Sequence, residues 1–356
     1  MKRIILCADG TWNEPESRSK DSGRPQPTNV LKVARAVLPR SSTGVVQVVY
    51  YHEGVGTLGN LDKWTGGAFG RGMEKSVRSL YRFLVYNYEP SDELYFFGFS
   101  RGAFTVRTLV GFMNAVGLLN KDDEYFTPEM YNLYQSSTPI GSKEWQAAFK
   151  YVKDPRPCPP IHFVGVWDTV GALGPPGLLG QLLNRNKYQY HDIQLHPKVL
   201  HAYHALAIDE RRKPFAPSLL KRPVGWTGTL EQVWFAGVHS NVGGGYHPDG
   251  LANEALHWMV EKAEGLGLEF DSPFLAHYKP CFNSPLRDSM STLYKIMGPN
   301  VRAIGTGEAE VVHQSAFDRV NLSACQYDPA NLRAYVTSGA AQKPVNTTRI
   351  PRGTAC

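Results

Sequence analysis

Cysteine is scarce in this sequence, and long apolar runs are absent from it. The five cysteines are an odd number without CxxC spacing, which argues against a disulfide framework or a zinc knuckle and favours reduced thiols; they are Cys7, Cys158, Cys281, Cys325 and Cys356. No segment approaches the roughly 20 apolar residues that cross a bilayer. The apolar run Ile4–Ala8 is too short for a signal peptide. We therefore expect a cytoplasmic protein that does not use the general signal-peptide route.

Concentrated charge of one sign is also missing. The net charge is +6 over 356 residues, and the basic residues are scattered apart from Arg211–Lys213 and Lys221–Arg222. A nucleic-acid surface needs a basic patch, so we expect no nucleic-acid partner. The weak positive charge would assist only a transient contact with an anionic membrane surface. Composition is otherwise that of a globular protein, and it leaves the oligomeric state open.

Strand-like and helix-like segments alternate along the chain. Apolar helical stripes fall at residues 73–84, after Ser100, and at about 252–264. Runs rich in β-branched and aromatic residues lie between Gly or Asp residues and are typical of strands; they are Arg3–Ala8, Val45–His52, Glu93–Phe99, Ile161–Trp167 and Gln232–Val238. This pattern predicts an α/β fold of the α/β-hydrolase type, with a mostly parallel sheet and helices on both faces.

Two stretches interrupt this alternation. We expect residues 120–158 to form small helices outside the sheet, because they are aromatic and polar without a strand pattern. Together with residues 171–230 they are interpreted as insertions or a candidate lid in a core of residues 1–270. Residues 271–356 are expected to be a C-terminal extension that packs on this core.

The sharpest motif is the GxSxG of residues 98–102, which directly follows a strand and precedes a helix. In a nucleophile elbow the serine occupies a strained turn, and the flanking glycines avoid clashes. The helix N-terminus faces developing negative charge, so the N–H of Arg101 is a candidate oxyanion donor. A tight turn without catalysis is the alternative. The strand-turn-helix context favours Ser100 as the nucleophile of a serine hydrolase.

A nucleophilic serine needs a histidine base and an orienting carboxylate, which in such folds follow it in the order Asp or Glu, then His. Asp168 ends the strand at 161–167, and His239 follows the strand at 232–238. Both are therefore expected at the same sheet edge as Ser100. A capping aspartate and a loop histidine are the alternatives. Asp209 is the replacement candidate for Asp168.

The turn after the first strand has two interpretations. Asp9–Asn13 resembles the motif of haloacid-dehalogenase-type phosphatases, but Cys7 stands where their nucleophilic aspartate would be. We therefore favour a second oxyanion donor, from the N–H groups of Gly10 or Thr11.

Two further patterns carry no predicted site. Gly54–Gly59 matches the dinucleotide motif GxGxxG, but no helix follows at once, and a glycine-rich loop is the better interpretation. His201 and His204 are interpreted as helix residues, because no carboxylate-rich motif accompanies them. We expect no cofactor and no metal.

Over nearly its whole length the sequence resembles the DUF2235 family, whose members include the type VI secretion phospholipase effectors of the Tle1 kind. The matching segments occur in order; they are ADGTWN (8–13), TNV (28–30), the run from Gly54 through GGAFGRG (66–72), GFSRGAF (98–104), VWDTVGALG (166–174), HALAIDERR (204–212), GVHSNVGGGY (237–246) and VVHQSAFDR (311–319). The family usually has aspartate where this chain has Asn241. Since this sequence is also short, we expect it to lack the large added membrane-association modules of the secreted effectors.

The resemblance implies an α/β-hydrolase core and a lipase or phospholipase with a triad at Ser100, Asp168 and His239. The substrate would be an acyl ester or a phospholipid, and export by a specialised secretion system is a further implication. The Leu-rich stretch with Leu173, Leu178 and Leu179 is a candidate acyl-binding wall or lid, with a structural cap as the alternative. A binding protein that keeps the fold without turnover is the competing function, and a phosphatase is a third.

Overall fold

A parallel sheet organises the molecule. The computed structural model describes residues 1–10, 13, 15–18, 23–54, 66–136, 138–153, 155–171, 194–296, 298–339 and 341–348. Over these residues the strands are β1 (Arg3–Ala8), β2 (Gln47–His52), β3 (Glu93–Phe99), β4 (Phe163–Trp167), β5 (His201–Ala207), β6 (Thr229–Phe235) and β7 (Glu310–Val312). They lie in the order β2-β1-β3-β4-β5-β6-β7, and every neighbouring pair is parallel.

Burial on both faces explains the composition of the central strands. β1, β3 and β4 read RIILCA, ELYFFGF and FVGVW, and nearly all of these residues are buried. A parallel strand between two helical layers needs apolar side chains at successive positions, because both of its faces are covered. The edge strand β2 is only partly buried.

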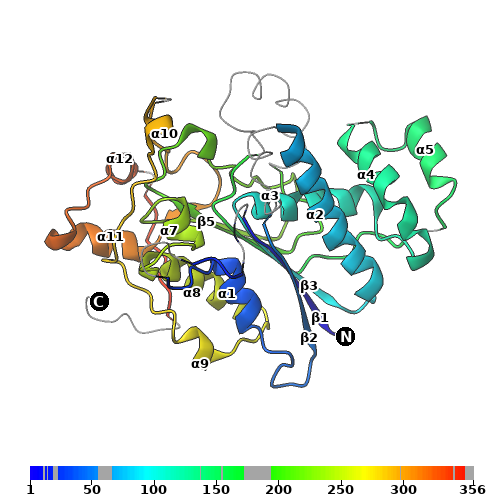
Figure 1. The fold of residues 1–356 in the computed structure, drawn as a ribbon, viewed down its shortest axis with the longest axis horizontal. Helices are drawn as coiled ribbons and strands as arrows, with labels where there is room; N and C mark the ends of the chain where they lie inside the picture. The colour runs from blue at the N-terminus through cyan, green and yellow to red at the C-terminus, as the bar shows by residue number, and fades with distance from the viewer. Residues whose placement is uncertain are drawn as a thin grey trace.

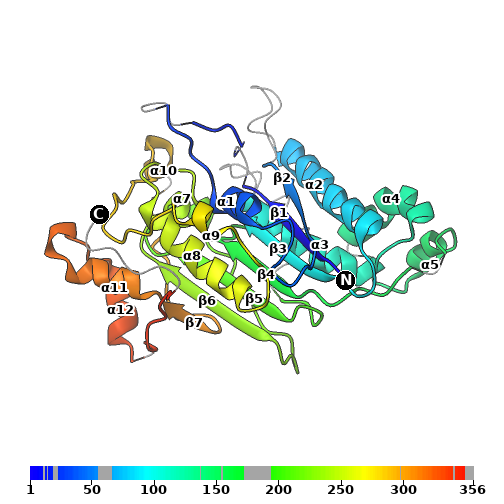
Figure 2. The same ribbon diagram turned by 90° about the horizontal axis from the view of Figure 1, so that it is seen from below.

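Helices cover both faces of the sheet (Figures 1 and 2). On one face, α2 (Gly66–Asn87) and α3 (Arg101–Val116) pack on β1, β3 and β4. On the other face, α1 (Asn29–Ala36) and α8 (Gly250–Glu264) form a second apolar core. These two layers confirm the predicted α/β fold class.

The remaining elements are short. Residues 120–158 form small helices outside the sheet, as predicted: η1 (Lys121–Phe126), α4 (Thr127–Gln135) and α5 (Lys143–Phe149), which lie beyond α2 in Figure 1. The other short helices are η2 (Lys213–Phe215), α7 (His239–Gly243), α9 (Ser272–Leu275), α10 (Thr292–Ile296), α11 (Gln314–Asn321), η3 (Ser323–Cys325) and α12 (Ala330–Thr337). A third apolar core joins the C-terminal helices to β5 and β6.

Two interpretations of the sequence are wrong. Residues 171–230 are not an insertion as a whole, because β5 lies among them and fills the sheet between β4 and β6. His201 and His204 are strand residues rather than helix residues. His204 is buried between β4 and β6, where its ring nitrogens have partners: Nε2 accepts the N–H of Thr169 at 3.1 Å and Nδ1 lies 3.3 Å from Gln232 Oε1. Because His201 and His204 interrupt the apolar run, the sequence does not show the pattern of a buried strand here.

The C-terminal region is more than a layer on the core. It packs on the core through α11 and α12, and it also supplies the edge strand β7 of the sheet itself. The predicted boundary at residue 270 therefore does not separate the sheet from an extension.

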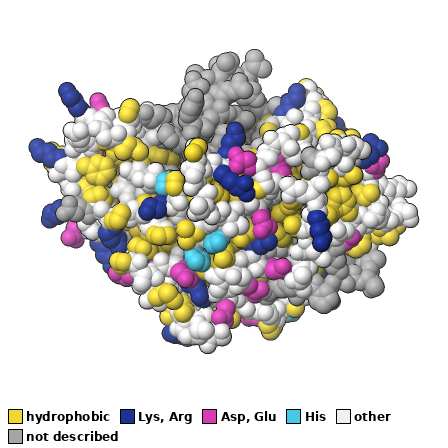
Figure 3. All heavy atoms as spheres, turned by 180° about the vertical axis from the view of Figure 1, so that it is seen from behind, with side chains coloured by type: hydrophobic (Ala, Val, Ile, Leu, Met, Phe, Trp, Pro, Cys, Tyr) yellow, Lys and Arg dark blue, Asp and Glu magenta, His cyan; other side chains and the backbone are white. Residues whose placement is uncertain are grey.

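Cys7, Cys158 and Cys325 are free, but the expectation of reduced thiols fails at Cys281, which is disulfide-bonded. No described helix combines the length and apolarity that a membrane span requires. On the face shown in Figure 3, basic side chains lie apart, with acidic and apolar ones between them.

Candidate active site

Three of the predicted residues follow strands that end at one edge of the sheet. Ser100 follows β3, Asp168 follows β4, and His239 lies shortly after β6 as the first residue of α7. The neighbouring strand β1 has β2 on one side and β3 on the other, so the chain order reverses there. Parallel α/β sheets bind ligands outside the carboxyl ends of their strands at such a reversal.

The backbone around Ser100 explains both glycines of the GxSxG motif. Ser100 has φ 57° and ψ −120°, a conformation that costs energy for a residue with a side chain. A Cβ on Gly98 would lie 2.6 Å from Ala103 Cα, and a Cβ on Gly102 would lie 2.1 Å from the carbonyl oxygen of Ala8. Glycine is therefore required at both positions, because α3 packs tightly on β3 and β1.

The structure brings Ser100, Asp168 and His239 into one hydrogen-bonded chain. The Nε2 atom of His239 lies 2.8 Å from Ser100 Oγ, and its Nδ1 atom lies 2.6 Å from Asp168 Oδ2. The three side chains are nearly excluded from solvent, with residue exposures of 5% for His239, 6% for Ser100 and 0% for Asp168. The histidine can therefore exchange a proton with the serine while its second nitrogen is held by a carboxylate.

The Asp168 carboxylate is held by three groups besides His239. Its Oδ1 accepts the backbone N–H of Ala207 at 3.0 Å and Nη1 of Arg302 at 2.6 Å. Its Oδ2 accepts Nη2 of Arg302 at 3.0 Å. Burial alone would raise the pKa of Asp168, but Arg302 and His239 outweigh burial and hold that pKa well below its ordinary value. Asp168 is therefore ionised at neutral pH.

The imidazole of His239 lies between two aromatic rings. Its ring centroid is 4.6 Å from that of Phe99 and 4.9 Å from that of Phe215. Burial lowers the pKa of His239, although the hydrogen bond to Asp168 opposes this effect. The imidazole is therefore neutral at neutral pH, which is the state that can accept a proton.

A second carboxylate lies beside His239. Glu210 Oε2 accepts the backbone N–H of His239 at 3.2 Å, and both Glu210 oxygens accept hydrogen bonds from the Arg212 guanidinium. Burial would raise the pKa of Glu210, but Arg212 outweighs burial and lowers it. Arg212 in turn lies over the ring of Phe215, 3.4 Å from its centroid. Two carboxylate–arginine pairs thus flank the histidine.

The replacement candidate Asp209 is used elsewhere. Its Oδ2 accepts the N–H of Gly237 at 2.7 Å and the hydroxyl of Tyr327 at 2.9 Å. Asp168, rather than Asp209, is the carboxylate that meets His239.

The predicted oxyanion donors lie at the start of α3 and in the turn after β1. Arg101 is the first residue of α3, where backbone N–H groups have no acceptor within the helix. The N–H of Gly10 donates to Asp9 Oδ1 at 2.7 Å and is already engaged. A Cβ on Gly10 would lie 3.2 Å from Ser100 Cβ, so the turn after β1 does adjoin the serine. Thr11 lies outside the described residues.

Asp9 holds this turn in place. Its Oδ2 accepts the hydroxyls of Thr28 at 2.5 Å and Tyr51 at 2.8 Å. Burial raises the pKa of Asp9 to about 6, although these hydrogen bonds lower it in part. The carboxylate thus ties β1 to β2 and to the start of α1.

Asn241 and the glycines after it fix the loop behind His239. The side-chain oxygen of Asn241 accepts the N–H groups of Val238 at 3.4 Å and Arg287 at 3.2 Å. A Cβ on Gly243 would lie 1.9 Å from the ring of Phe99, so this glycine permits close packing rather than flexibility. Either an asparagine or an aspartate oxygen can accept these bonds.

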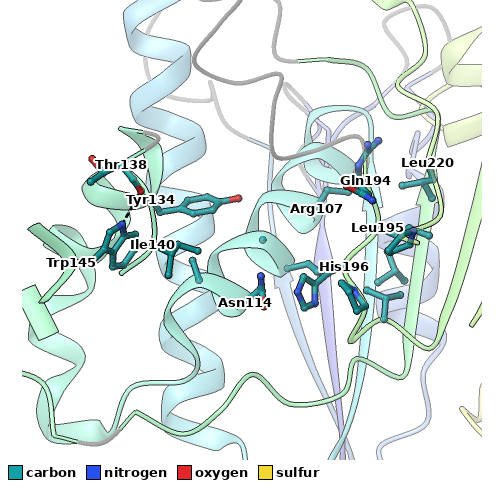
Figure 4. A pocket seen from close by; sticks show the side chains of 17 residues that line it. Arg107, Asn114, Tyr134, Thr138, Ile140, Trp145, Gln194, Leu195, His196 and Leu220 are labelled. Carbon is teal, nitrogen blue, oxygen red and sulfur yellow. Dashed lines mark hydrogen bonds between the residues drawn. The ribbon is translucent and has the colours of Figure 1, made fainter. Parts of the chain in front are cut away.

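A cavity of about 420 Å³ lies beside α3 (Figure 4). Tyr134 and Trp145, from the helices outside the sheet, contribute to one side of it, and Leu195 and Leu220 contribute to the other. None of Ser100, Asp168 and His239 lines this cavity. The predicted acyl-wall residues Leu173, Leu178 and Leu179 lie outside the described residues, as do residues 55–59 of the glycine-rich motif.

Sequence reasoning missed Arg302, Glu210 and Phe215. Arg302 and Phe215 belong to no motif with recognisable spacing, and Arg302 is 134 positions from the carboxylate that it contacts. For Glu210, the segment HALAIDERR (204–212) is the available signal, but in that segment only Asp209 is considered as a site carboxylate. Among the described residues, no group of three or more His, Cys, Asp and Glu could hold a metal ion.

Comparison with known proteins gives one family and one curated relative. The sequence model described as type VI secretion system, phospholipase effector Tle1-like, catalytic domain, matches residues 2–262. The uncharacterized protein YEL023C of Saccharomyces cerevisiae is 29% identical over 240 residues, which are 60% of this chain and 32% of the yeast protein. The chain therefore spans about a third of the length of this relative.

Two solved structures are similar to part of the chain. An uncharacterized protein from Pseudomonas aeruginosa has a TM-score of 0.49 and 18% identity, covering 79% of this chain and 49% of its own. The Tle1 effector bound to the VgrG spike of the type 6 secretion system has a TM-score of 0.37 and 20% identity, covering 69% and 51%. Because the family's sequence model matches 2–262 out of 356 residues, the chain belongs to the Tle1-like phospholipase effector family, within its catalytic domain.

Proposed function

We propose that this protein hydrolyses carboxylic esters of lipids, with Ser100 as nucleophile, His239 as general base and Asp168 as the orienting carboxylate. The observation that carries the proposal is the continuous hydrogen-bonded chain from Asp168 Oδ2, through both ring nitrogens of His239, to Ser100 Oγ. Membership of a phospholipase effector family supports phospholipids as the substrate class.

The proposed reaction has two stages. His239 Nε2 takes the proton of Ser100 as Oγ attacks the acyl carbonyl, and Asp168 stabilises the imidazolium that forms. The tetrahedral intermediate then expels the alcohol, which receives the proton from His239, and an acyl-enzyme remains. Water repeats the sequence: His239 accepts its proton, the hydroxide adds to the acyl group, and the fatty acid leaves as Ser100 regains its proton.

The negative oxygen of each intermediate needs donors. The N–H of Arg101 is suited to this task because it opens α3, whose positive dipole end faces the elbow. We propose it as the first oxyanion donor. A second donor from the turn after β1 would have to come from Thr11, or from Gly10 after it leaves Asp9.

For the acyl chain we propose the wall formed by residues 120–158 and the Leu-rich stretch around Leu178. Tyr134 and Trp145 line the cavity of about 420 Å³ beside α3, whose size is within the range of ligand sites although Ser100, Asp168 and His239 do not line it. The net charge of +6 would add a weak, salt-sensitive attraction to an anionic lipid surface. Export by a type VI secretion system is a further proposal from family membership.

A fluorophosphonate probe tests the chemistry without knowledge of the substrate. Wild-type protein should be labelled at Ser100, as located by mass spectrometry of its peptides, and Ser100→Ala should not be labelled. Ser240→Ala is the matched control, because this neighbour of His239 has no part in the hydrogen-bonded chain. An unlabelled wild-type protein would favour the alternative of a binding protein without turnover.

The substrate class needs a separate measurement. p-Nitrophenyl esters of increasing length should be compared with vesicles of fluorescent phospholipid. Release of fatty acid from the vesicles would support a phospholipase. Activity on short esters alone would limit the protein to a simple esterase.

A further inference from the structure

Arg302 reaches the candidate site from outside the residues that match the family's sequence model, which end at 262. We propose that Arg302 is a positioning residue. It orients the Asp168 carboxylate toward His239, and it lowers the pH at which this pair takes up an additional proton. The inference rests on the proposed function, because Arg302 acts through the base of Ser100.

Arg302 and Asp168 form a bidentate ion pair. Nη1 donates to Oδ1 at 2.6 Å and Nη2 donates to Oδ2 at 3.0 Å, so the fork of the guanidinium fixes the plane of the carboxylate. Oδ2, the oxygen that receives Nη2, is also the one that accepts His239 Nδ1 at 2.6 Å. Rotation of the carboxylate would break all of these bonds at once.

Arg302 is itself fixed by the surrounding backbone. Nη1 also donates to the carbonyl of Ala207 at 2.8 Å, and Nη2 donates to the carbonyl of Phe215. The carbonyl of Arg302 accepts Nδ2 of Asn331 in α12 at 3.0 Å. Its side chain is only 1% exposed. The carbonyls of Ala207 and Phe215 therefore hold the guanidinium, while Asn331 ties the main chain of Arg302 to α12.

The charge of Arg302 decides how readily the site takes up a proton. A lone carboxylate as buried as Asp168 would draw a proton strongly, either onto itself or onto His239. Because the guanidinium of Arg302 contacts the carboxylate, a proton added to the Asp168–His239 pair brings further positive charge next to that of Arg302. The two residues titrate as a coupled pair, so removal of Arg302 raises the pH at which the pair becomes protonated.

Other titratable and charged groups face this pair from neighbouring elements. Glu210 contacts the backbone of His239 and is paired with Arg212. His204 is buried next to Thr169, and burial lowers its pKa to about 3, so it is neutral. Arg107 lies near His204 and donates to the carbonyl of Ser218 at 2.7 Å.

The test is the rate of fluorophosphonate labelling of Ser100 as a function of pH. For Arg302→Met, the midpoint of the acid limb should move up by about one pH unit, because a charge in contact is removed. Its plateau rate should fall by about tenfold as the carboxylate loses its orientation. Arg302→Lys keeps the charge without the fork, so its plateau should fall while its midpoint stays closer to that of wild type.

Arg319→Met is the matched control. Arg319 is also buried and donates to the backbone carbonyls of Phe282 and Ser284, but it has no contact with Asp168. Its loss should leave the midpoint and the plateau as in wild type, which separates positioning from general support of the C-terminal region.

The outcomes separate this inference from the proposed function. A folded Arg302→Met protein with the midpoint and plateau of wild type would overturn the role of Arg302 alone. Where the Met variant does not fold, a wild-type plateau in Arg302→Lys overturns it. Absence of labelling in wild type at every pH would overturn the proposed function together with this inference.

Discussion

His239 is tied to the protein through its main chain as well as its side chain: its N–H donates to Glu210 Oε2 at 3.2 Å. The same residue bridges Asp168 and Ser100 with its two ring nitrogens. Because both ends of the residue are held, the imidazole can pass a proton without leaving its place. Glu210 also contributes negative charge near this ring.

Glu210→Gln should therefore move the acid limb of activity to lower pH. The loss of the Glu210 charge, and of its neutralising effect on Arg212, makes a protonated His239 less favourable. The direction is opposite to that expected for Arg302→Met. Measurement of kcat/KM against pH for both variants tests the electrostatics, and shifts in the same direction would contradict it.

The unmodified protein should be active below the ordinary histidine range. Burial depresses the pKa of His239 below the ordinary histidine value of about 6.5, so the base becomes protonated only at a pH lower than that value. Activity should rise along a limb with its midpoint under that value and then level off. Because the pKa of His239 is lower in the folded state than in the unfolded state, its contribution to the free energy of unfolding is fully present above about pH 6.5. This contribution is lost as the pH falls through the folded-state pKa. An activity midpoint above neutrality would contradict this assignment.

Ser100→Ala should lower ester hydrolysis by about three orders of magnitude or more, since it deletes the nucleophile. His239→Ala should cost a similar factor, and the double variant should cost little more than either change alone. Steady-state rates on a p-nitrophenyl ester measure this, with circular dichroism to confirm folding. Losses that multiply in the double variant would place His239 outside the reacting unit.

Gly98→Ala should destabilise the protein by roughly 1–3 kcal/mol, because the new Cβ would lie 2.6 Å from Ala103 Cα. Gly265→Ala is the control, since its Cβ would meet Glu261 O at 3.4 Å and its φ is −59°. That change should be neutral or slightly stabilising. Urea unfolding of the two variants gives the comparison, and equal midpoints would argue against the tight packing of the elbow.

Activity should increase with acyl length until the cleft is filled. Each buried methylene contributes about 0.8 kcal/mol to binding, so medium and long esters should be preferred over acetate. Relative kcat/KM values over a length series measure this. An enzyme that is fastest on acetyl esters and inert on phospholipid vesicles would refute the lipase function and leave the serine hydrolase chemistry intact.

The sequence predicted those parts of the site that carry a local signal. Ser100 has a motif with its own steric logic, and Asp168 and His239 follow apolar strands that end at one sheet edge. The sequence does not reveal the strand at 201–207 because His201 and His204 break the apolar pattern, while the buried ring of His204 is satisfied by partners such as Gln232 in the next strand. Only the assembled sheet shows that partnership.

Arg302 and the engagement of Gly10 were out of reach for the same reason. An arginine in a loop has no pattern that marks it as the partner of a carboxylate 134 positions earlier. The bond from Gly10 N–H to Asp9 Oδ1 depends on how Thr28 and Tyr51 hold that carboxylate. Such contacts are set by tertiary geometry rather than by neighbouring residues.

The span of these contacts along the chain has a consequence for folding. The bonds within the site join residues 71, 139 and 134 positions apart, and β7 adds the last strand of the sheet from beyond residue 300. Contacts between distant positions form late and slowly, whereas helices such as α2 and α8 need only local contacts. Recovery of labelling after dilution from denaturant is therefore a stricter measure of complete refolding than recovery of helical signal.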